Sequence, residues 1–154
     1  MSQLPRVVAM LSWIRKEFLK EISMDKVVDM VNHPNHYANN RMRQIIGVEC
    51  IDFTRHLSFD VGNAFKYVWR CSDKGKVAQD LEKAAFYLND HLENISFLTP
   101  YCIGDEIDDL VDGMWEFNEE SVSDFEMKQI EVLRKIIYSP REALVYLEQL
   151  RVMV

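Results

Sequence analysis

The sequence predicts an all-α protein, a compact helical domain with an N-terminal amphipathic helix and acidic C-terminal helices. Apolar residues recur at the three- and four-residue spacing of helices. Only five Gly and four Pro interrupt the 154 residues, and no strand alternation, internal repeat or low-complexity run is present. Apolar residues make up 48% and charged residues 28% of the chain, which is typical of a globular protein.

The length is close to that of one domain with appended elements. We expect an N-terminal helical extension over residues 1–30, a core over 31–96 and an acidic helical extension over 97–154. The net charge of −7 is uneven, because residues 1–100 carry 13 basic and 12 acidic side chains whereas residues 101–154 carry 5 and 13. Nucleic acid is therefore not an expected partner, since binding to its phosphates takes many Lys and Arg contacts.

The cysteines and the N-terminal segment indicate a cytoplasmic protein. Cys50, Cys71 and Cys102 are odd in number and form no CxxC motif, which fits a reducing compartment. Residues 4–22 carry six charged side chains, so they lack the apolar run of a signal peptide or membrane span. We interpret them as an amphipathic helix that packs on a core or a partner, with no membrane expected.

The expected elements follow in order from periodicity, caps and breakers. A polar loop occupies residues 32–40. Ser58 or Asp60 can cap the helix that ends near residue 72, and a turn is centred on Gly75. Ser139-Pro140 is typical of a cap followed by proline at the first helical position. After the N-terminal helix, we expect helices over residues 48–57, 60–72, 77–95, 104–117, 122–138 and 141–153.

The helix over residues 60–72 carries a polar face without an acid. Asn63, Lys66, Tyr67 and Arg70 stand at i, i+3, i+4 and i+7, so they share one side of the helix. An ordinary solvated face is one interpretation. The residue types favour another, because Lys and Arg one turn apart can bind an anion while Asn can contact an amide edge or a hydroxyl. The pattern indicates a phosphate or nucleotide surface.

The next helix carries a second polar stripe. Asp80 and Lys83 can pair with each other at i, i+3. Alternatively, Asp80 is a structural brace for Lys66 or Arg70 of the neighbouring helix, which leaves Lys83 available to a ligand phosphate. The stripe consists of Asp80, Lys83, Tyr87 and His91.

Two carboxylates stand on the helix over residues 48–57. Glu49 and Asp52, at i, i+3, could be Mg²⁺ ligands or a base for proton transfer. A surface pair of Asp52 with Arg55 or His56 is the alternative.

The two histidines of the polar loop do not predict a zinc site. His33 and His36 form an H-x-x-H spacing with no Cys or third His nearby, whereas zinc takes three or four ligands, so no zinc is expected. His36 and Tyr37 are better interpreted as a pair that contacts a ligand or fixes the loop on a helix.

Residues 31–93 resemble the SaV-like family of tailed-bacteriophage proteins, a helical family that includes a phage nucleotide kinase. The family pattern is a Pro before His-Tyr, a Glu near Ile-Asp, Gly-Asn-x-x-Lys-Tyr-x-x-Arg, and Asp-x-x-Lys-Ala-x-x-Tyr. The chain departs from it at residues 71–74, where Lys74 can replace a missing cation, and near Asn40, where Gly is common. The matching residues are Pro34, His36, Tyr37, Glu49, Asp52, Gly62, Asn63, Lys66, Tyr67, Arg70, Asp80, Lys83, Ala84 and Tyr87.

The resemblance implies a phage protein in the infected host's cytoplasm that transfers phosphate from ATP to a deoxynucleoside monophosphate, with Mg²⁺ as a candidate cofactor. The chain has no GxxxxGK[ST] loop, so a conventional nucleotide-kinase fold is excluded. The negative charge of the phosphates would then be neutralised by side chains rather than by a glycine-rich loop. The implied catalytic residues are Glu49, Asp52, Lys66 and Arg70, with Glu49 and Asp52 as Mg²⁺ ligands. The implied nucleotide-binding residues are His36, Tyr37, Asn63, Tyr67, Lys83 and Tyr87.

Two other functions remain open. The same basic and aromatic face suits a protein that binds a nucleotide without converting it, for example one that inhibits a host defence. The acidic run after residue 104 has three interpretations: the metal site of an all-α nucleotide pyrophosphohydrolase, a surface for a host protein, or a solvated face. Its residues on one helical side are Asp105, Asp108, Asp109 and Asp112. We also expect a homo-oligomer, because Trp13, Phe18, Trp115 and Phe117 exceed what a small core needs.

Overall fold

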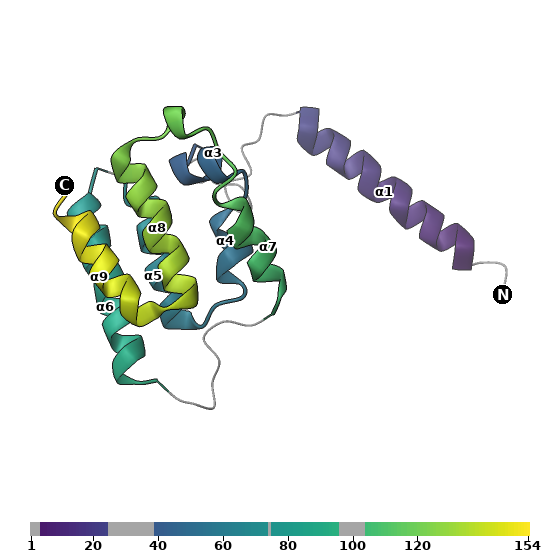
Figure 1. Cartoon of the computed structure of the whole chain (residues 1–154). Coiled ribbons are helices and arrows are strands. Elements are labelled where there is room, and N and C mark those ends of the chain that lie inside the picture. The colour runs from purple at the N-terminus through teal and green to yellow at the C-terminus, as the bar shows by residue number, and fades with distance from the viewer. Residues whose placement is uncertain (1–3, 25–38, 74, 96–103) are drawn as a thin grey trace. The chain divides into compact units, whose positions relative to one another are not determined.

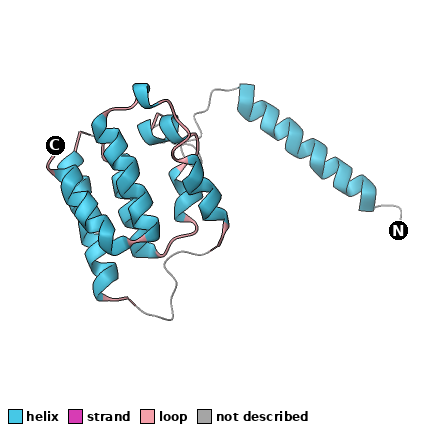
Figure 2. Ribbon diagram, viewed as in Figure 1, coloured by secondary structure: helices cyan, strands magenta, loops and turns pink. Residues whose placement is uncertain are grey.

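The computed structural model describes residues 4–24, 39–73, 75–95 and 104–154. The chain divides into two compact units, Met1–Asn35 and His36–Val154. Within the described residues every regular element is a helix, which confirms the all-α prediction (Figure 2). No helix in these ranges is long and apolar enough to cross a membrane.

The first unit contains α1, Leu4–Met24, as the apolar period of the N-terminal segment predicts. Apolar side chains of this helix are exposed, among them Leu11 and Trp13, which are 57% and 62% exposed. The side chain of Phe18 lies outside the described residues, so the expected role of these residues in oligomerisation stays a prediction.

The second unit is built around four helices that contact one another in a ring, α5 to α6 to α9 to α8 and back to α5 (Figure 1). Both C-terminal helices therefore pack within the same unit as the helices of the predicted core. Shorter helices α3 and α4 pack on α5. The elements are α3 Arg41–Ile46, α4 Cys50–Thr54, α5 Phe59–Arg70, α6 Val77–Glu93, α7 Glu106–Gly113, the 3-10 helix η1 Glu119–Ser121, α8 Asp124–Tyr138 and α9 Pro140–Arg151.

The core lies where the apolar faces of α5, α6, α8 and α9 meet. Phe53 of α4 stacks against Phe65 and Trp69 of α5, with ring centroids 5.1 and 5.7 Å apart. Gln129 of α8 is fully buried, and its amide nitrogen donates to the carbonyl oxygens of Val68 and Trp69 at 2.6 and 3.3 Å. These carbonyls are in the last turn of α5, where the regular backbone hydrogen bonds of a helix run out, so Gln129 fixes the end of α5 on α8.

Local signals explain most boundaries. Ser139 caps α9 through Glu142 N–H, and Pro140 is the first residue of that helix, as predicted. Ser123 and Glu126 form a capping box that starts α8. Helix α3 was not expected from the sequence. Its ends are nevertheless marked, because Asn40 accepts from Arg43 N–H and Gly47, with φ of 85°, ends the helix.

Two contacts fix α3 within the second unit. The Asn40 amide donates to Asp73, which follows α5. Arg41 Nε donates to Glu126 Oε1 of α8 at 2.7 Å, and this hydrogen bond lowers the pKa of Glu126. Asn40 is 2% exposed, so the residue that caps α3 is buried.

Candidate functional site

The polar sides of α5 and α6 meet at the ring of Tyr67. The side-chain nitrogens of Lys66 and Lys83 lie 4.9 and 5.4 Å from the ring centroid, and the guanidinium carbon of Arg70 lies 4.7 Å from it. Tyr87 of α6 stacks on Tyr67, with centroids 5.8 Å apart and planes at 14°. Helical spacing predicted the neighbours on α5, and the α5–α6 contact brings in the two residues of α6.

Arg70 is engaged by Asp80, whose side chain is 5% exposed. Nε and Nη2 of Arg70 donate to the two carboxylate oxygens at 3.2 and 3.3 Å, so the pair is bidentate. Of the two alternatives for Asp80, the structure shows the contact with Arg70 rather than one with Lys83. Asp80 thus neutralises Arg70 and ties α6 to α5 over the Tyr67 ring.

The two lysines are placed differently. Lys66 Nζ donates to Asn63 Oδ1 at 2.9 Å, and Asn63 Nδ2 donates to the Phe59 carbonyl at 3.0 Å. Within the described part of the chain, neither Lys66 nor Lys83 forms an ion pair with a carboxylate. Asp80 balances the charge of Arg70, so the charges of Lys66 and Lys83 are not balanced by a carboxylate of the face. An anion that binds this partly buried surface would balance them.

Two aromatic residues that sequence reasoning missed flank this cluster. Phe59 and Phe86 meet the Tyr87 ring edge-on, with centroids 6.1 and 5.3 Å from it, and they are 77% and 63% exposed. A signal was present, because Phe59 lies one turn before Asn63 on the polar side of α5. We call the cluster the α5–α6 face. It consists of Phe59, Asn63, Lys66, Tyr67, Arg70, Asp80, Lys83, Phe86 and Tyr87.

Two residues of the polar stripe of α6 are buried. His91 is 8% exposed and so does not belong to an open polar side, and Asp80 is buried as well. His91 is near the C-terminal end of α6, where it and Asp90 lie close enough to Asp60 to act on its charge. The polar stripe of α6 is therefore exposed only in its middle turns.

Glu49 and Asp52 occupy the start of α4. The carboxylate of Asp52 accepts from Glu49 N–H at 3.0 Å, and its other oxygen accepts from Arg55 Nη2, also at 3.0 Å. Glu49 Oε1 lies 3.3 Å from Arg43 Nη2. Asp52 thus forms the surface pair weighed as the alternative to a catalytic role, and each carboxylate has an arginine beside it.

Cys50 connects this helix start to the basic cluster. The thiol is 8% exposed, and burial raises its pKa to about 12 although the charges of Lys66 and Arg70 lower it. Those charges act on Cys50 because the start of α4 lies close to the α5–α6 face. The thiol itself is protonated at neutral pH and is not a nucleophile.

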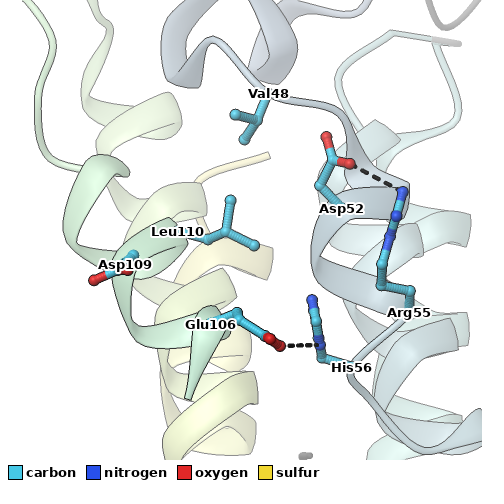
Figure 3. A pocket seen from close by; sticks show the side chains of 7 residues that line it. All are labelled: Val48, Asp52, Arg55, His56, Glu106, Asp109 and Leu110. Carbon is cyan, nitrogen blue, oxygen red and sulfur yellow. Dashed lines mark hydrogen bonds and ion pairs between the residues drawn. The ribbon is translucent and has the colours of Figure 1, made fainter. Parts of the chain in front are cut away.

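A shallow pocket of about 380 Å³ lies between α4 and α7 (Figure 3). Asp52 points toward Arg55 on one side of it, and His56 Nδ1 points toward Glu106 Oε2 at 4.0 Å across it. Asp52 and Glu106 thus each stand beside a basic side chain of this pocket. We call this the α4–α7 pocket. Its lining residues are Val48, Asp52, Arg55, His56, Glu106, Asp109 and Leu110.

The carboxylates do not make a metal site by themselves. Among the described residues, no three His, Cys, Asp or Glu side chains group as a metal ion would require. Glu49 and Asp52 are also held by arginines, so their donor oxygens do not fit a resident Mg²⁺.

The acids of α7 are directed to different neighbours. Asp108 accepts from the Tyr138 hydroxyl at 2.6 Å, and burial together with this bond raises the pKa of Tyr138 to about 12. Asp109 lines the α4–α7 pocket, and Asp105 precedes the helix.

Two of the aromatic residues expected at an oligomer contact follow α7. Trp115 lies under Arg134, with the guanidinium carbon 5.8 Å from the ring centroid, and Phe117 packs on the core. Phe117 is therefore used within this unit.

Some predicted site residues lie outside the described residues: His33, Pro34, His36, Tyr37 and Lys74.

Comparison with known proteins gives one match. Residues 31–89 are similar to a family of proteins of unknown function, DUF3310. No curated protein and no solved structure matches the chain. The matched range covers α3 to most of α6, and hence the α5–α6 face, but the similarity carries no activity with it. The resemblance to the SaV-like family stays a prediction.

Proposed function

We propose that the α5–α6 face binds a deoxynucleoside monophosphate. The observation that carries this proposal is the convergence of Lys66 and Lys83 on the Tyr67 ring, with no carboxylate partner among the described residues. Two ammonium groups around one ring can hold a phosphate dianion together, each as a compact charge with several donors. The similarity to DUF3310 covers these residues.

In this proposal Arg70 has a different role from the one the sequence predicts. Its guanidinium is engaged by Asp80, so it positions the Tyr67 ring and holds α5 against α6. The phosphate is left to the two lysines. If Arg70 bound a ligand phosphate in place of Asp80, the Asp80 carboxylate, which is 5% exposed, would be left buried without a counter-charge. Such an exchange costs free energy.

The reaction that the family resemblance implies is transfer of the γ-phosphate of ATP to the bound monophosphate, giving a diphosphate and ADP. For this step the lysines would stabilise the charge on the transferred group and hold acceptor and donor in line. Asp80, the carboxylate of the face, is held by Arg70, so the proposal assigns no general base. Binding without conversion is the second candidate, because the same geometry supports it.

The test measures binding and turnover separately on the full chain. Affinity for the deoxynucleoside monophosphates is measured by calorimetry for the wild type, Lys66→Ala, Lys83→Ala and the double variant. Since a hydrogen bond to a charged group contributes about 1.5–3 kcal/mol, we expect each substitution to weaken binding about 10- to 100-fold.

Lys128→Ala is the matched control, because Lys128 also lies over a tyrosine, Tyr146 at 4.7 Å, but pairs with Glu131. It should leave affinity unchanged. Formation of ADP and a deoxynucleoside diphosphate from ATP supports the kinase, and tight binding without product supports the second candidate. A wild type that binds no monophosphate contradicts the proposal.

A further inference from the structure

We infer that the α5–α6 face accepts all four bases and selects its ligand by the phosphate and the flat face of the base. This inference rests on the proposed function and names its substrate class: deoxynucleoside monophosphates without base selectivity. It follows from which side chains of the face still have an open surface and which are occupied by their neighbours.

The tyrosine pair is occupied by its neighbours. Tyr67 and Tyr87 stack on each other, and three cationic groups stand within 5.4 Å of the Tyr67 centroid. A base is therefore not expected to stack on Tyr67, which the family resemblance assigns to nucleotide binding. The cations and the second ring fix Tyr67 as the centre of the cluster.

The phenylalanines offer the open aromatic surface. Phe59 and Phe86 each lie nearly perpendicular to Tyr87, at 77° and 84°, and neither is stacked on it. They are 77% and 63% exposed on a face that also carries Lys66 and Lys83. A base that covers such a ring buries apolar area and gains stacking energy, and every base has a π face to offer.

Among the described residues of the face, the groups that could contact a base edge are engaged or adaptable. Both ends of the Asn63 amide are hydrogen-bonded, to Lys66 and to the Phe59 carbonyl. Two nitrogens of Arg70 are bound to Asp80. Phenylalanine has no donor or acceptor, and a tyrosine hydroxyl can rotate to donate or accept, so neither enforces one base. Asn63 is thus a positioning residue here.

The experiment is a calorimetric titration of the full chain with dAMP, dGMP, dCMP and dTMP, with deoxyribose 5-phosphate and with the unphosphorylated deoxynucleosides. We expect the four monophosphates to bind within about fivefold of one another, with purines ahead because they stack over a larger area. Deoxyribose 5-phosphate should bind about 10- to 100-fold more weakly. The deoxynucleosides should bind more weakly still.

Phe59→Leu and Phe86→Leu remove the aromatic face and keep an apolar side chain. They should weaken all four monophosphates about equally, by roughly 10-fold, and leave deoxyribose 5-phosphate unchanged. Val145→Ala, at a 60% exposed apolar residue of α9, is the control and should change nothing. One base preferred by more than about 30-fold overturns the inference and leaves the proposed function standing. Absence of binding by every phosphate compound overturns both.

Discussion

The α5–α6 face and the α4–α7 pocket contain similar charged side chains but pair them differently. In the pocket, Asp52 pairs with Arg55, and His56 Nδ1 lies 4.0 Å from Glu106 Oε2, so two of the pocket's acids stand beside a basic side chain. On the face, Asp80 balances only Arg70, and Lys66 and Lys83 have no carboxylate partner among the described residues. Matched charges stabilise a helix junction, whereas unmatched charges beside exposed aromatic rings are suited to a ligand.

The same comparison separates two kinds of arginine. Arg55 pairs with Asp52 where both side chains are well exposed, 56% and 36%, so this pair contributes little to stability. Arg70 pairs with an Asp80 side chain that is 5% exposed, and breaking such a pair leaves a charge in a poorly solvated place. The arginine of the face is thus structural in a way that the arginine of the pocket is not.

The largest effect is expected for Asp80→Asn. The substitution leaves Arg70 partly buried without its counter-charge, and we expect a loss of about 3 kcal/mol in the free energy of unfolding, measured by urea denaturation. Affinity for a monophosphate should fall as well, because Tyr67 and its cations lose their support.

The control for Asp80→Asn is the double variant Asp80→Leu with Arg70→Met. It removes both charges and keeps apolar volume, so it should regain most of the lost stability. A loss below about 1 kcal/mol in the single variant would show that the pair behaves like an exposed one and would remove the contrast with the pocket.

A smaller effect is expected for Asp52→Asn in the pocket. Asparagine keeps an oxygen that can accept from Glu49 N–H while the charge next to Arg55 is lost, so unfolding should become easier by less than about 1 kcal/mol. Monophosphate affinity should stay within twofold of the wild type.

The informative contrary result is kinetic. If Asp52→Asn abolishes phosphate transfer while affinity and stability are unchanged, the carboxylate has the catalytic role that the sequence predicts. Asp52 would then belong to the same site as the α5–α6 face, and the distinction between face and pocket would be wrong. The start of α4 is near enough for this, since the charges of Lys66 and Arg70 act on Cys50.

The fold class and the long helices could be predicted because the signals are local. A period of 3.6 residues and a cap such as Ser139 act within one helix. Helix α3 was missed because its six residues are too few to show a period. Its only signals were the Asn40 cap and the Gly47 end.

The site could be predicted in part for the same reason. Asn63, Lys66 and Arg70 are neighbours by helical spacing, and the contact of Asp80 with Arg70 was one of two alternatives. The pocket that Asp52 lines could not be predicted, because its other wall is α7, more than 50 residues further along the chain. Burial of His91 likewise follows from tertiary packing, which the pattern of α6 does not show.

The smallest effect concerns an acid at the end of the α5–α6 contact. Burial and the nearby Asp90 raise the pKa of Asp60, while His91 lowers it. Unlike the acids of the pocket, Asp60 therefore faces another acid, and ionisation is harder in the folded state than in the unfolded one. Asp60→Asn should stabilise the protein at neutral pH by about 0.5 kcal/mol, the size of a like-charge contact.

The pH dependence of this gain follows from the direction of the shift. Below the ordinary aspartate pKa of about 3.9 the carboxyl is protonated in both states, so the variant and the wild type should be equally stable. As pH rises past that value the unfolded chain ionises first, the wild type loses stability, and the gain from Asp60→Asn grows until the folded carboxyl is ionised too. Urea denaturation from pH 3 to 7 measures this. If Asp60→Asn is already more stable than the wild type at pH 3, the gain comes from packing and not from charge. The repulsion by Asp90 would then not distinguish Asp60 from the paired acids of the pocket.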